Sequence, residues 1–268
     1  MARAEDLVAE HPFVVAHRGA SLQRPEHTLA AYDLALQEGA DGVECDVRLT
    51  SDGHLVCVHD RRVDRTSNGA GVVSEMTLSQ LQGFDYGGWR DDRQRAPLSA
   101  ADTGLLTLDA LVALVLDWHR PVKIFIETKH PVRYGALVER QVLDLLTRFG
   151  IAAPASATRS RAVVMSFSAA AVWRIRRVAP LLPTVLLGSA ARYLGGSAAT
   201  TVGATAIGPS IETLREHPEL VDHAAARGRA LYCWTVDRDE DVDFCRDVGV
   251  AWIATNQPAR TKARLRAG

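Results

Sequence analysis

The sequence is short of three features that mark special classes of protein: paired cysteines, an excess of one charge and long apolar runs. Its four cysteines form no C-x-x-C pair, so the sequence predicts buried thiols in a reducing cytoplasm, with neither a zinc cage nor a redox dithiol. Lysine and arginine number 31 and aspartate and glutamate 32, for a formal net charge of −1. That balance provides no electrostatic footprint for nucleic acid or for an anionic membrane surface.

The apolar stretches are also too short to cross a bilayer. The longest, 104–118 and 178–191, are interrupted by Asp109 or by two prolines, and a spanning helix needs about 20 apolar residues. Within the first 19 residues, the adjacent acids Glu5 and Asp6 stand where a secretion signal needs an apolar segment. We therefore expect a soluble, cytoplasmic protein that does not insert stably into a membrane.

Short β-branched runs alternate along the chain with segments of helical period. Eight runs predict strands, at 13–17, 42–49, 122–128, 162–167, 183–188, 205–210, 230–236 and 251–255. Six segments predict helices, at 28–38, 107–117, 134–149, 168–179, 212–227 and 238–247. Repeated strand-then-helix units favour parallel pairing with right-handed crossovers, so the chain is expected to form an α/β fold, a (β/α)8 TIM barrel. An open doubly wound sheet is the alternative.

One interval breaks this regularity. After the second strand, "TSDG" (50–53) predicts a tight turn, and 54–60 returns as a further strand. Residues 61–104 are then rich in glycine, aspartate and serine, and a loop of that length is typical of a functional segment or a small subdomain. We expect residues 1–268 to form a single domain that contains 61–104 as a small insertion.

Two acids stand side by side on the predicted second strand. A strand places residues two apart on one face, so Glu44 and Asp46 point one way and the aliphatic residues around them point the other. If they face the barrel interior, Glu127 on the next barrel strand converges with them. Carboxylates that close repel unless a cation lies between them, and an all-oxygen site suits Mg²⁺ or Ca²⁺. The alternative is a solvated pair at a sheet edge.

Other polar residues gather at the predicted strand ends, where a barrel places its active site. His17 and His59 each end an apolar strand and precede a charged residue. Imidazole titrates near neutrality, so one can accept a proton while the other donates one. Arg18 and Lys129 are candidates to hold an anion, or else to form salt bridges with the same acids. Trp234 is a candidate at the substrate site, with a plain core position as its alternative.

These residues belong to a longer pattern. "HRG", "PEHT", "ECDV", "TSDG" and "HD" follow one another within residues 13–71, and "FIETK" and "CWTVD" come later. The pattern resembles the glycerophosphodiester phosphodiesterase family in order over nearly the whole chain. The resemblance implies a TIM barrel with a small insertion after the second strand. Two positions depart from it: His27 stands where the family usually has Asn, and "TNQP" (255–258) replaces the more usual T-D-x-P.

The resemblance also implies a role for each candidate residue. It implies metal binding by Glu44, Asp46 and Glu127, acid–base catalysis by His17 and His59, and phosphate contact by Arg18 and Lys129. Glu26 and Asp60 are further candidates at or beside the metal site, and a carboxylate such as Asp60 is also suited to orienting His59. His27 falls near the metal, where it would alter the hydrogen bonds of the ligands.

The predicted reaction is metal-dependent hydrolysis of a glycerophosphodiester to sn-glycerol 3-phosphate and an alcohol. The expected cofactor is Mg²⁺ or Ca²⁺, and the expected partner is the small-molecule diester. One alternative is a lysophospholipid phosphodiesterase on the same barrel; this would need an apolar rim, for which the insertion supplies only Phe84, Tyr86 and Trp89. Another is a phosphate-ligand binding protein that has lost catalysis, although none of the metal acids or of the two histidines is missing.

Overall fold

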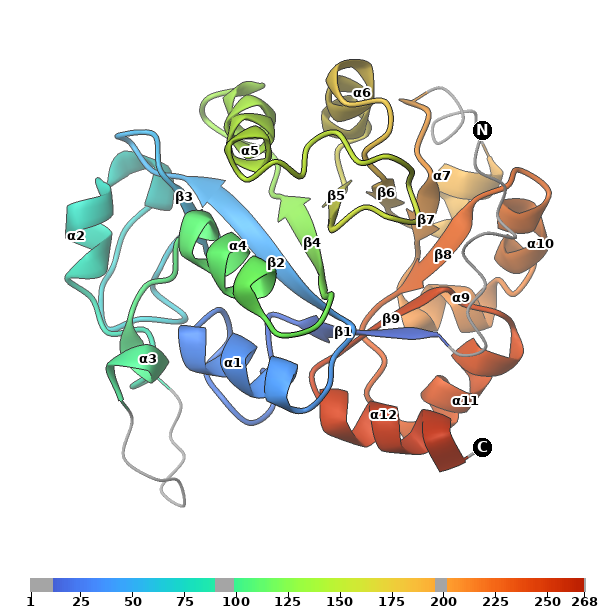
Figure 1. Cartoon of the computed structure of the whole chain (residues 1–268). Coiled ribbons are helices and arrows are strands. Elements are labelled where there is room, and N and C mark those ends of the chain that lie inside the picture. The colour runs from blue at the N-terminus through green and yellow to red at the C-terminus, as the bar shows by residue number, and fades with distance from the viewer. Residues whose placement is uncertain (1–11, 90–98, 196–201, 268) are drawn as a thin grey trace.

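Eight parallel strands close into a barrel in the computed structural model, which describes residues 12–89, 99–195 and 202–267 (Figure 1). The strands are β1 (Phe13–His17), β2 (Gly42–Leu49), β4 (Lys123–Thr128), β5 (Ala162–Ser166), β6 (Thr184–Leu187), β7 (Ala206–Gly208), β8 (Ala230–Cys233) and β9 (Trp252–Thr255). Because β1 pairs with both β2 and β9, these eight strands form a closed ring. The predicted TIM barrel is confirmed, and the open sheet is wrong.

The predicted return strand lies outside the barrel. β3 (Leu55–Cys57) pairs antiparallel with β2. The segment that follows holds the 3-10 helix η2 (Val73–Glu75), α2 (Leu78–Gln82) and α3 (Ala100–Thr103), and Figure 1 shows α2 and α3 on one side of the barrel. It has a small core of its own, formed by Val56, Val58, Val63, Val73, Leu81 and Tyr86. On this arrangement we propose that 61–104 is an insertion in a single domain; its residues 90–98 lie outside the described residues.

Helices surround the barrel, and five of the six predicted ones are present as single helices. These are α1 (Leu29–Gln37), α4 (Leu108–Asp117), α5 (Leu137–Arg148), α6 (Ala169–Val178) and α11 (Asp239–Asp247). The continuous helix predicted at 212–227 is wrong, because α9 (Ile211–Glu216) ends before Pro218 and α10 (Leu220–Ala225) begins after it. Proline disfavours the helical conformation of the residue that precedes it.

Two further helices have too weak an apolar period to be predicted. α7 (Ala190–Leu194) has only five residues, and α12 (Pro258–Ala267) is largely polar. α12 nevertheless packs against α11 and β1. Tertiary contact, more than amphipathic sequence, therefore defines these two helices.

Alternation along the strands separates two environments. On β2, Cys45 and its aliphatic neighbours pack against the outer helices, whereas Glu44 and Asp46 point into the barrel. The barrel interior is filled by aromatic and aliphatic side chains around Phe125, whose ring lies 5.7 Å from that of Tyr232. The acids therefore lie beside the apolar side chains that fill the barrel, toward the carboxyl ends of the strands.

The expectations drawn from composition can be compared with the structure. All four cysteines are free and buried, as predicted: Cys45, Cys57, Cys233 and Cys245. Within the described ranges, the structure contains no helix of the length and apolarity that a membrane span requires.

Candidate active site

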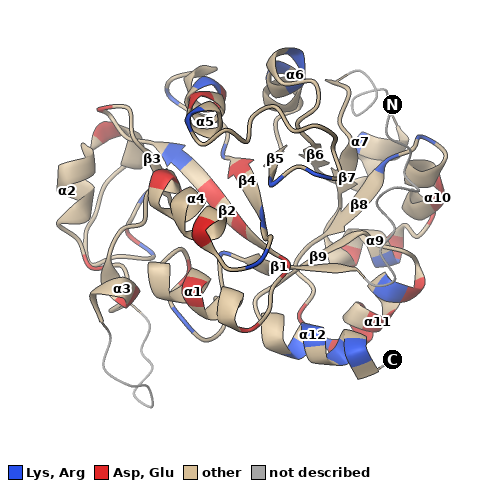
Figure 2. Ribbon diagram, in the orientation of Figure 1, with Lys and Arg blue, Asp and Glu red and all other residues tan. Residues whose placement is uncertain are grey.

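Three buried carboxylates meet between the middle of β2 and the end of β4. Glu127 stands opposite Asp46 in the parallel ladder, and Glu44 lies two residues earlier on the same face of β2. One oxygen of each of the three lies within 4.8 Å of an oxygen of the others. Figure 2 shows these acidic segments of β2 and β4 within the ring of strands. The structure thus brings the three predicted residues together, and the alternative of a solvated pair at a sheet edge is wrong.

Two cationic side chains reach the same carboxylates. Lys129 Nζ lies 2.8 Å from Glu127 Oε1 and 3.2 Å from Asp46 Oδ1. Arg18 Nε lies 3.2 Å from Asp46 Oδ2, and its backbone N–H donates to Glu44 Oε2 at 3.1 Å. Arg18 adopts φ 57, a left-handed conformation that directs the strained turn after β1 toward the acids. The salt bridges considered for Arg18 and Lys129 are therefore present.

The carboxylates differ in how readily they carry charge. Burial and then the charge of Asp46 raise the pKa of Glu44 well above its usual value, and the same two causes raise the pKa of Glu127 to about 7. Burial also opposes ionisation of Asp46, but a hydrogen bond from His27 and the charge of Lys129 hold its pKa well below the usual range. Two of the three acids thus lack sufficient positive charge nearby. A buried set of oxygens with that deficit fits a hard divalent cation.

His17 ends β1 and is held from the far end of the chain. Its Nδ1 lies 2.9 Å from Asn256 Oδ1, just after β9. Asn256 Nδ2 donates to Asp237 Oδ2 at 2.6 Å, which turns the amide oxygen toward His17. An amide oxygen only accepts, so His17 Nδ1 donates and Nε2 keeps its lone pair. Burial and then the charge of Arg18 lower the pKa of His17 to about 4.

His59 follows β3 and has a carboxylate as its partner. Its Nδ1 lies 2.6 Å from Asp60 Oδ1, and Arg65 Nε donates to Asp60 Oδ2 at 2.6 Å. Burial lowers the pKa of His59, and the charge of Arg18 acts in the same direction, whereas Asp46 and Asp60 oppose them. Asp60 therefore contacts the ring of His59, in the position expected of a residue that orients it.

Both histidines line one cavity of about 110 Å³. Arg18, Lys129, Glu44 and Glu127 form its polar side. The opposite side is apolar and consists of Met165, Phe167, Leu187, Tyr232 and Trp234. The ring of Trp234 meets Phe167 edge-on at 5.6 Å, and its Nε1 donates to Gly208 O. Trp234 therefore faces the cavity while it also packs against the side chains of the barrel interior.

Glu26 lies beside the three acids but outside their group. Its Oε1 is 3.0 Å from Arg18 Nη1, and Arg65 donates to both of its oxygens at 2.8 and 2.9 Å. Burial opposes ionisation, but the hydrogen bonds of Arg65 and the nearby positive charges lower the pKa of Glu26 to about 2. Within the described part of the chain, the acids grouped closely enough to share a metal are the other three. Glu26 instead links the arginines that touch Asp46 and Asp60.

The unusual residue at position 27 touches one of the three acids directly. His27 is buried and adopts φ 62. Its Nε2 lies 3.0 Å from Asp46 Oδ2 and its Nδ1 2.8 Å from the Tyr32 hydroxyl, which donates to Glu44 O. The expected effect on hydrogen bonding near the acids is therefore present in the geometry.

Several residues at the site have no counterpart in the predictions. Asn256 belongs to the "TNQP" departure, whose role is not apparent in the sequence, and Asp237 directly follows "CWTV". Both lie about 220 to 240 residues from His17 along the chain, so spacing alone carries no signal of their contact. Arg65 lies in the insertion, and apart from its charge nothing in the sequence marks it as a residue of the site.

Comparisons with known proteins agree on one family. The model of the "Glycerophosphoryl diester phosphodiesterase family" matches residues 17–260. The chain is 74% identical over 268 residues to the Mycobacterium tuberculosis protein called "Probable glycerophosphodiester phosphodiesterase 1", covering 100% of this chain and 97% of that protein. It is 32% identical to a glycerophosphodiester phosphodiesterase of Caldanaerobacter subterraneus, covering 91% and 94% of the two chains.

Solved structures show the same barrel. The crystal structure of glycerophosphodiester phosphodiesterase from Agrobacterium tumefaciens superposes with a TM-score of 0.75 at 26% identity, covering 94% of this chain and 99% of that one. An Oleispira antarctica phosphodiesterase, solved in complex with the product sn-glycerol-3-phosphate, superposes with a TM-score of 0.81. It is 20% identical, with 96% and 97% of the two chains covered, so this second likeness concerns the fold.

Proposed function

The chain belongs to the glycerophosphoryl diester phosphodiesterase family, and we propose that it hydrolyses glycerophosphodiesters to sn-glycerol 3-phosphate and an alcohol in a metal-dependent reaction. The observation that carries this proposal is the single cavity in which both histidines face Arg18, Lys129 and the buried acids. Such a cavity combines charge stabilisation with proton transfer. Membership of an enzyme family, with the three acids and both histidines in place, leaves no support for a binding protein without catalysis.

Glu44, Asp46 and Glu127 are the residues that would hold the cation, because they form a compact all-oxygen set. When bound, a divalent cation neutralises charge on the phosphoryl oxygens and polarises the phosphorus. Arg18 and Lys129 line the same cavity and add fixed positive charge for the remaining oxygens. The charge that grows in the transition state is thus met by groups that are already in place.

The two histidines divide the proton transfers. His17 Nε2 takes a proton from the attacking water, or from the glycerol 2-hydroxyl if a cyclic phosphate forms first, because its amide partner leaves that nitrogen unprotonated. The new bond joins the attacking oxygen to phosphorus, and the bond from phosphorus to the alcohol oxygen breaks. His59 gives its proton to the departing alkoxide, and Asp60 stabilises the imidazolium that donates it.

The apolar side of the cavity and the insertion favour a small substrate. Trp234 and Phe167 form a surface against which the carbons of glycerol pack. Tyr86 is buried, Phe84 packs against the small core of the insertion, and Trp89 Nε1 donates to Tyr86 O. The bulky side chains of the insertion thus pack largely on one another, which supports a water-soluble diester over a lysophospholipid.

The test is release of glycerol 3-phosphate from glycerophosphocholine. We expect turnover by the untreated enzyme, loss of turnover after chelation, and recovery when Mg²⁺ or Ca²⁺ is restored. The same assay on lysophosphatidylcholine should give a much lower rate. Activity that survives exhaustive chelation would contradict the metal, and turnover of the lysophospholipid alone would favour the alternative substrate.

A further inference from the structure

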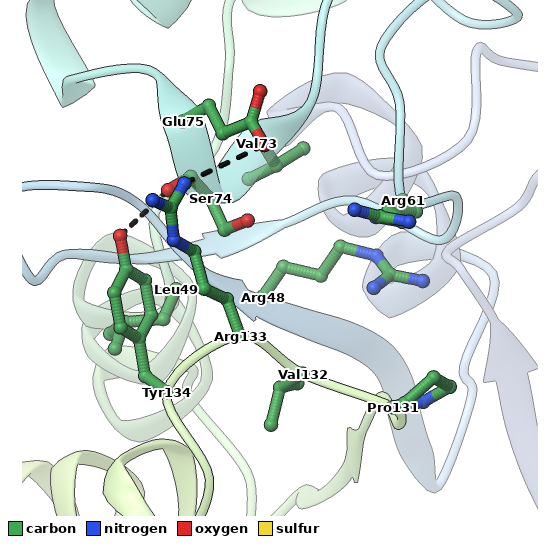
Figure 3. Close-up of a pocket in the computed structure, with 10 residues that line it drawn as sticks. All are labelled: Arg48, Leu49, Arg61, Val73, Ser74, Glu75, Pro131, Val132, Arg133 and Tyr134. Atoms are coloured by element: carbon green, nitrogen blue, oxygen red, sulfur yellow. Dashed lines mark hydrogen bonds and ion pairs between the residues drawn. The ribbon is translucent and has the colours of Figure 1, made fainter.

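A second and larger cavity, of about 360 Å³, lies between the insertion and the loop after β4 (Figure 3). Its insertion side includes Arg61 and Glu75, and its barrel side includes Arg48 and the segment from Pro131 to Tyr134. Figure 3 shows the three arginine side chains of this cavity, Arg48, Arg61 and Arg133, around the space between the two segments. We refer to it as the arginine pocket.

The arginine pocket begins where the active site ends. Arg48 lies two residues beyond Asp46 on β2 and so extends from the same face of the strand. Its Nε and Nη2 donate to His59 O at 3.0 and 2.7 Å. Arg61 and Pro131 follow His59 and Lys129 by two residues each. Three residues of the pocket are therefore chain neighbours of three residues of the active site.

Positive charge exceeds negative charge among the side chains that line the arginine pocket. Glu75 is the one acid in its lining, and it pairs with Arg133 at 3.5 Å. The hydrogen bonds of Arg48 go to a carbonyl, although the charges of Asp46, Asp60 and Glu127 act on its guanidinium from the active-site side. Among the described residues, Arg61 lines the pocket without an ion pair. Two guanidinium groups thus line one cavity without a carboxylate partner of their own. Guanidinium groups in that state are suited to bidentate binding of a phosphate or carboxylate.

The walls of the pocket are joined across its rim. The Tyr134 hydroxyl donates to Ser74 O at 2.7 Å, which ties the loop after β4 to η2. The ion pair of Arg133 with Glu75 links the same two segments. The cavity is therefore enclosed between two connected segments, and an anion entering it meets donors that are already positioned.

We propose that the arginine pocket binds an anionic group, a phosphate or a carboxylate, carried by the alcohol part of the diester. This inference rests on the proposed function, because it assigns the pocket to the same substrate. The pocket adjoins His59, the residue assigned to protonate the departing alcohol. An anionic substituent of that alcohol would therefore point toward the arginine pocket. The enzyme then prefers diesters with an anionic head group over those with a neutral or cationic one.

A matched pair of substrates tests this preference. Glycerophosphoinositol 4-phosphate and glycerophosphoinositol differ by one phosphate on the head group. We expect a higher kcat/KM for the phosphorylated diester, and a loss of about tenfold in that preference in Arg61→Gln and in Arg133→Gln. The kcat/KM for glycerophosphoinositol should stay unchanged. Arg159→Gln is the control, because Arg159 is an exposed arginine before β5, at the opposite end of the barrel.

A binding measurement keeps the inference testable without turnover. Inositol 4-phosphate, titrated by calorimetry, should bind the wild-type and Arg159→Gln proteins about tenfold more tightly than Arg61→Gln. Equal affinities in all three proteins, or equal kcat/KM for the two diesters, would overturn the pocket assignment. If neither diester is hydrolysed while inositol 4-phosphate still binds through Arg61, the proposed function fails and the anion site stands.

A free anion is the other source of the same chemistry. Inorganic phosphate would then change the turnover of glycerophosphoinositol by the wild-type enzyme and leave Arg61→Gln unaffected, with no preference between the two diesters. That result would contradict a head-group site. We expect instead that phosphate competes only with the phosphorylated diester at concentrations that leave glycerophosphoinositol hydrolysis unchanged.

Discussion

The surroundings of His17 and His59 differ in the charge of the group that each ring touches. His17 ends a barrel strand, and its partner is the neutral amide of Asn256. His59 follows a strand outside the barrel, about a third of its side chain is exposed, and its partner is the carboxylate of Asp60. Burial and the charge of Arg18 keep the imidazole of His17 unprotonated, whereas the carboxylates of Asp46 and Asp60 oppose the lowering of the pKa of His59, and an anionic partner stabilises imidazolium. One residue type can thus supply a base in one place and an acid a short distance away.

The supports of the two rings differ as well. Asn256 is anchored by Asp237, on the segment after β8, so the position of His17 depends on the closed barrel. Asp60 is anchored by Arg65, which belongs to the insertion. His17 is therefore supported by the barrel and His59 by the segment added to it. A change in the insertion should affect His59 first.

Removing either ring gives the largest expected effect. His17→Ala and His59→Ala should each lower kcat/KM on glycerophosphocholine by roughly 10²–10⁴-fold, as expected for a lost general base or acid. A p-nitrophenyl ester of glycerol phosphate separates their roles, because nitrophenolate leaves without a proton. His59→Ala should recover most of its rate on that ester, and His17→Ala should not.

The opposite pattern of recovery would exchange the two roles, and near wild-type turnover in either variant would remove that residue from the mechanism. Arg159→Gln provides the control for expression and folding. Circular dichroism should show the same helical content in all the proteins.

Asp60→Asn makes the two regions alike by giving His59 an amide partner. We expect kcat to fall by about 10–100-fold, the range seen when a residue that orients a functional histidine is lost. The fall should be smaller on the p-nitrophenyl ester than on glycerophosphocholine. Equal losses on both esters would show that Asp60 acts on the structure and not through the acid.

Asn256→Asp makes the reverse exchange by giving His17 a carboxylate. The pKa of His17 is lowered to about 4, so its ring is unprotonated at neutral pH, and its own protonation limits activity only near that pKa. A carboxylate partner favours imidazolium and raises the pKa of His17. The acidic limb of the kcat/KM profile should therefore move to higher pH in Asn256→Asp. An unmoved limb would mean that His17 is not the group that limits activity there.

The smallest expected effect concerns stability. Because the folded pKa of His17 lies below the unfolded value of about 6.5, the unfolded state binds the proton more readily, and folding is weakened as the pH falls from about 7 toward 4. Between pH 7 and 5.5 this contribution costs about 1 kcal/mol. Urea unfolding should therefore show a smaller decrease in the free energy of unfolding between pH 7 and 5.5 in His17→Gln than in the wild type, by about 1 kcal/mol. An identical loss in wild-type and variant would contradict the linkage.

Much of the fold follows from local pattern. The eight barrel strands and most of the helices are predicted within a few residues, because strand and helix periods show clearly in buried segments. The helix predicted at 212–227 is interrupted at Pro218, and this proline is itself a local signal for a helix boundary. α12 has a weak apolar period, and its position depends on contacts with α11 and β1.

The site divides in the same way. The alternation of Glu44 and Asp46 and the strand-end positions of His17 and His59 are properties of the sequence, since a strand has a period of two whatever surrounds it. The contacts of Glu26 with two arginines and of His27 with Asp46 cannot be read from the sequence. They depend on turns whose backbone direction only the folded chain sets.

The sequence by itself determined the barrel, the residues placed at its mouth and the all-oxygen character of their acids. Only the tertiary structure decided which partner each histidine receives. Asn256 reaches His17 because closure of the barrel brings β9 beside β1, and such a contact across 239 residues leaves no trace in local spacing. Asp60 is already next to His59 in the chain, but its alignment depends on Arg65 from the insertion. Periodicity assigns a side chain to a face, whereas closure of the sheet assigns its neighbour.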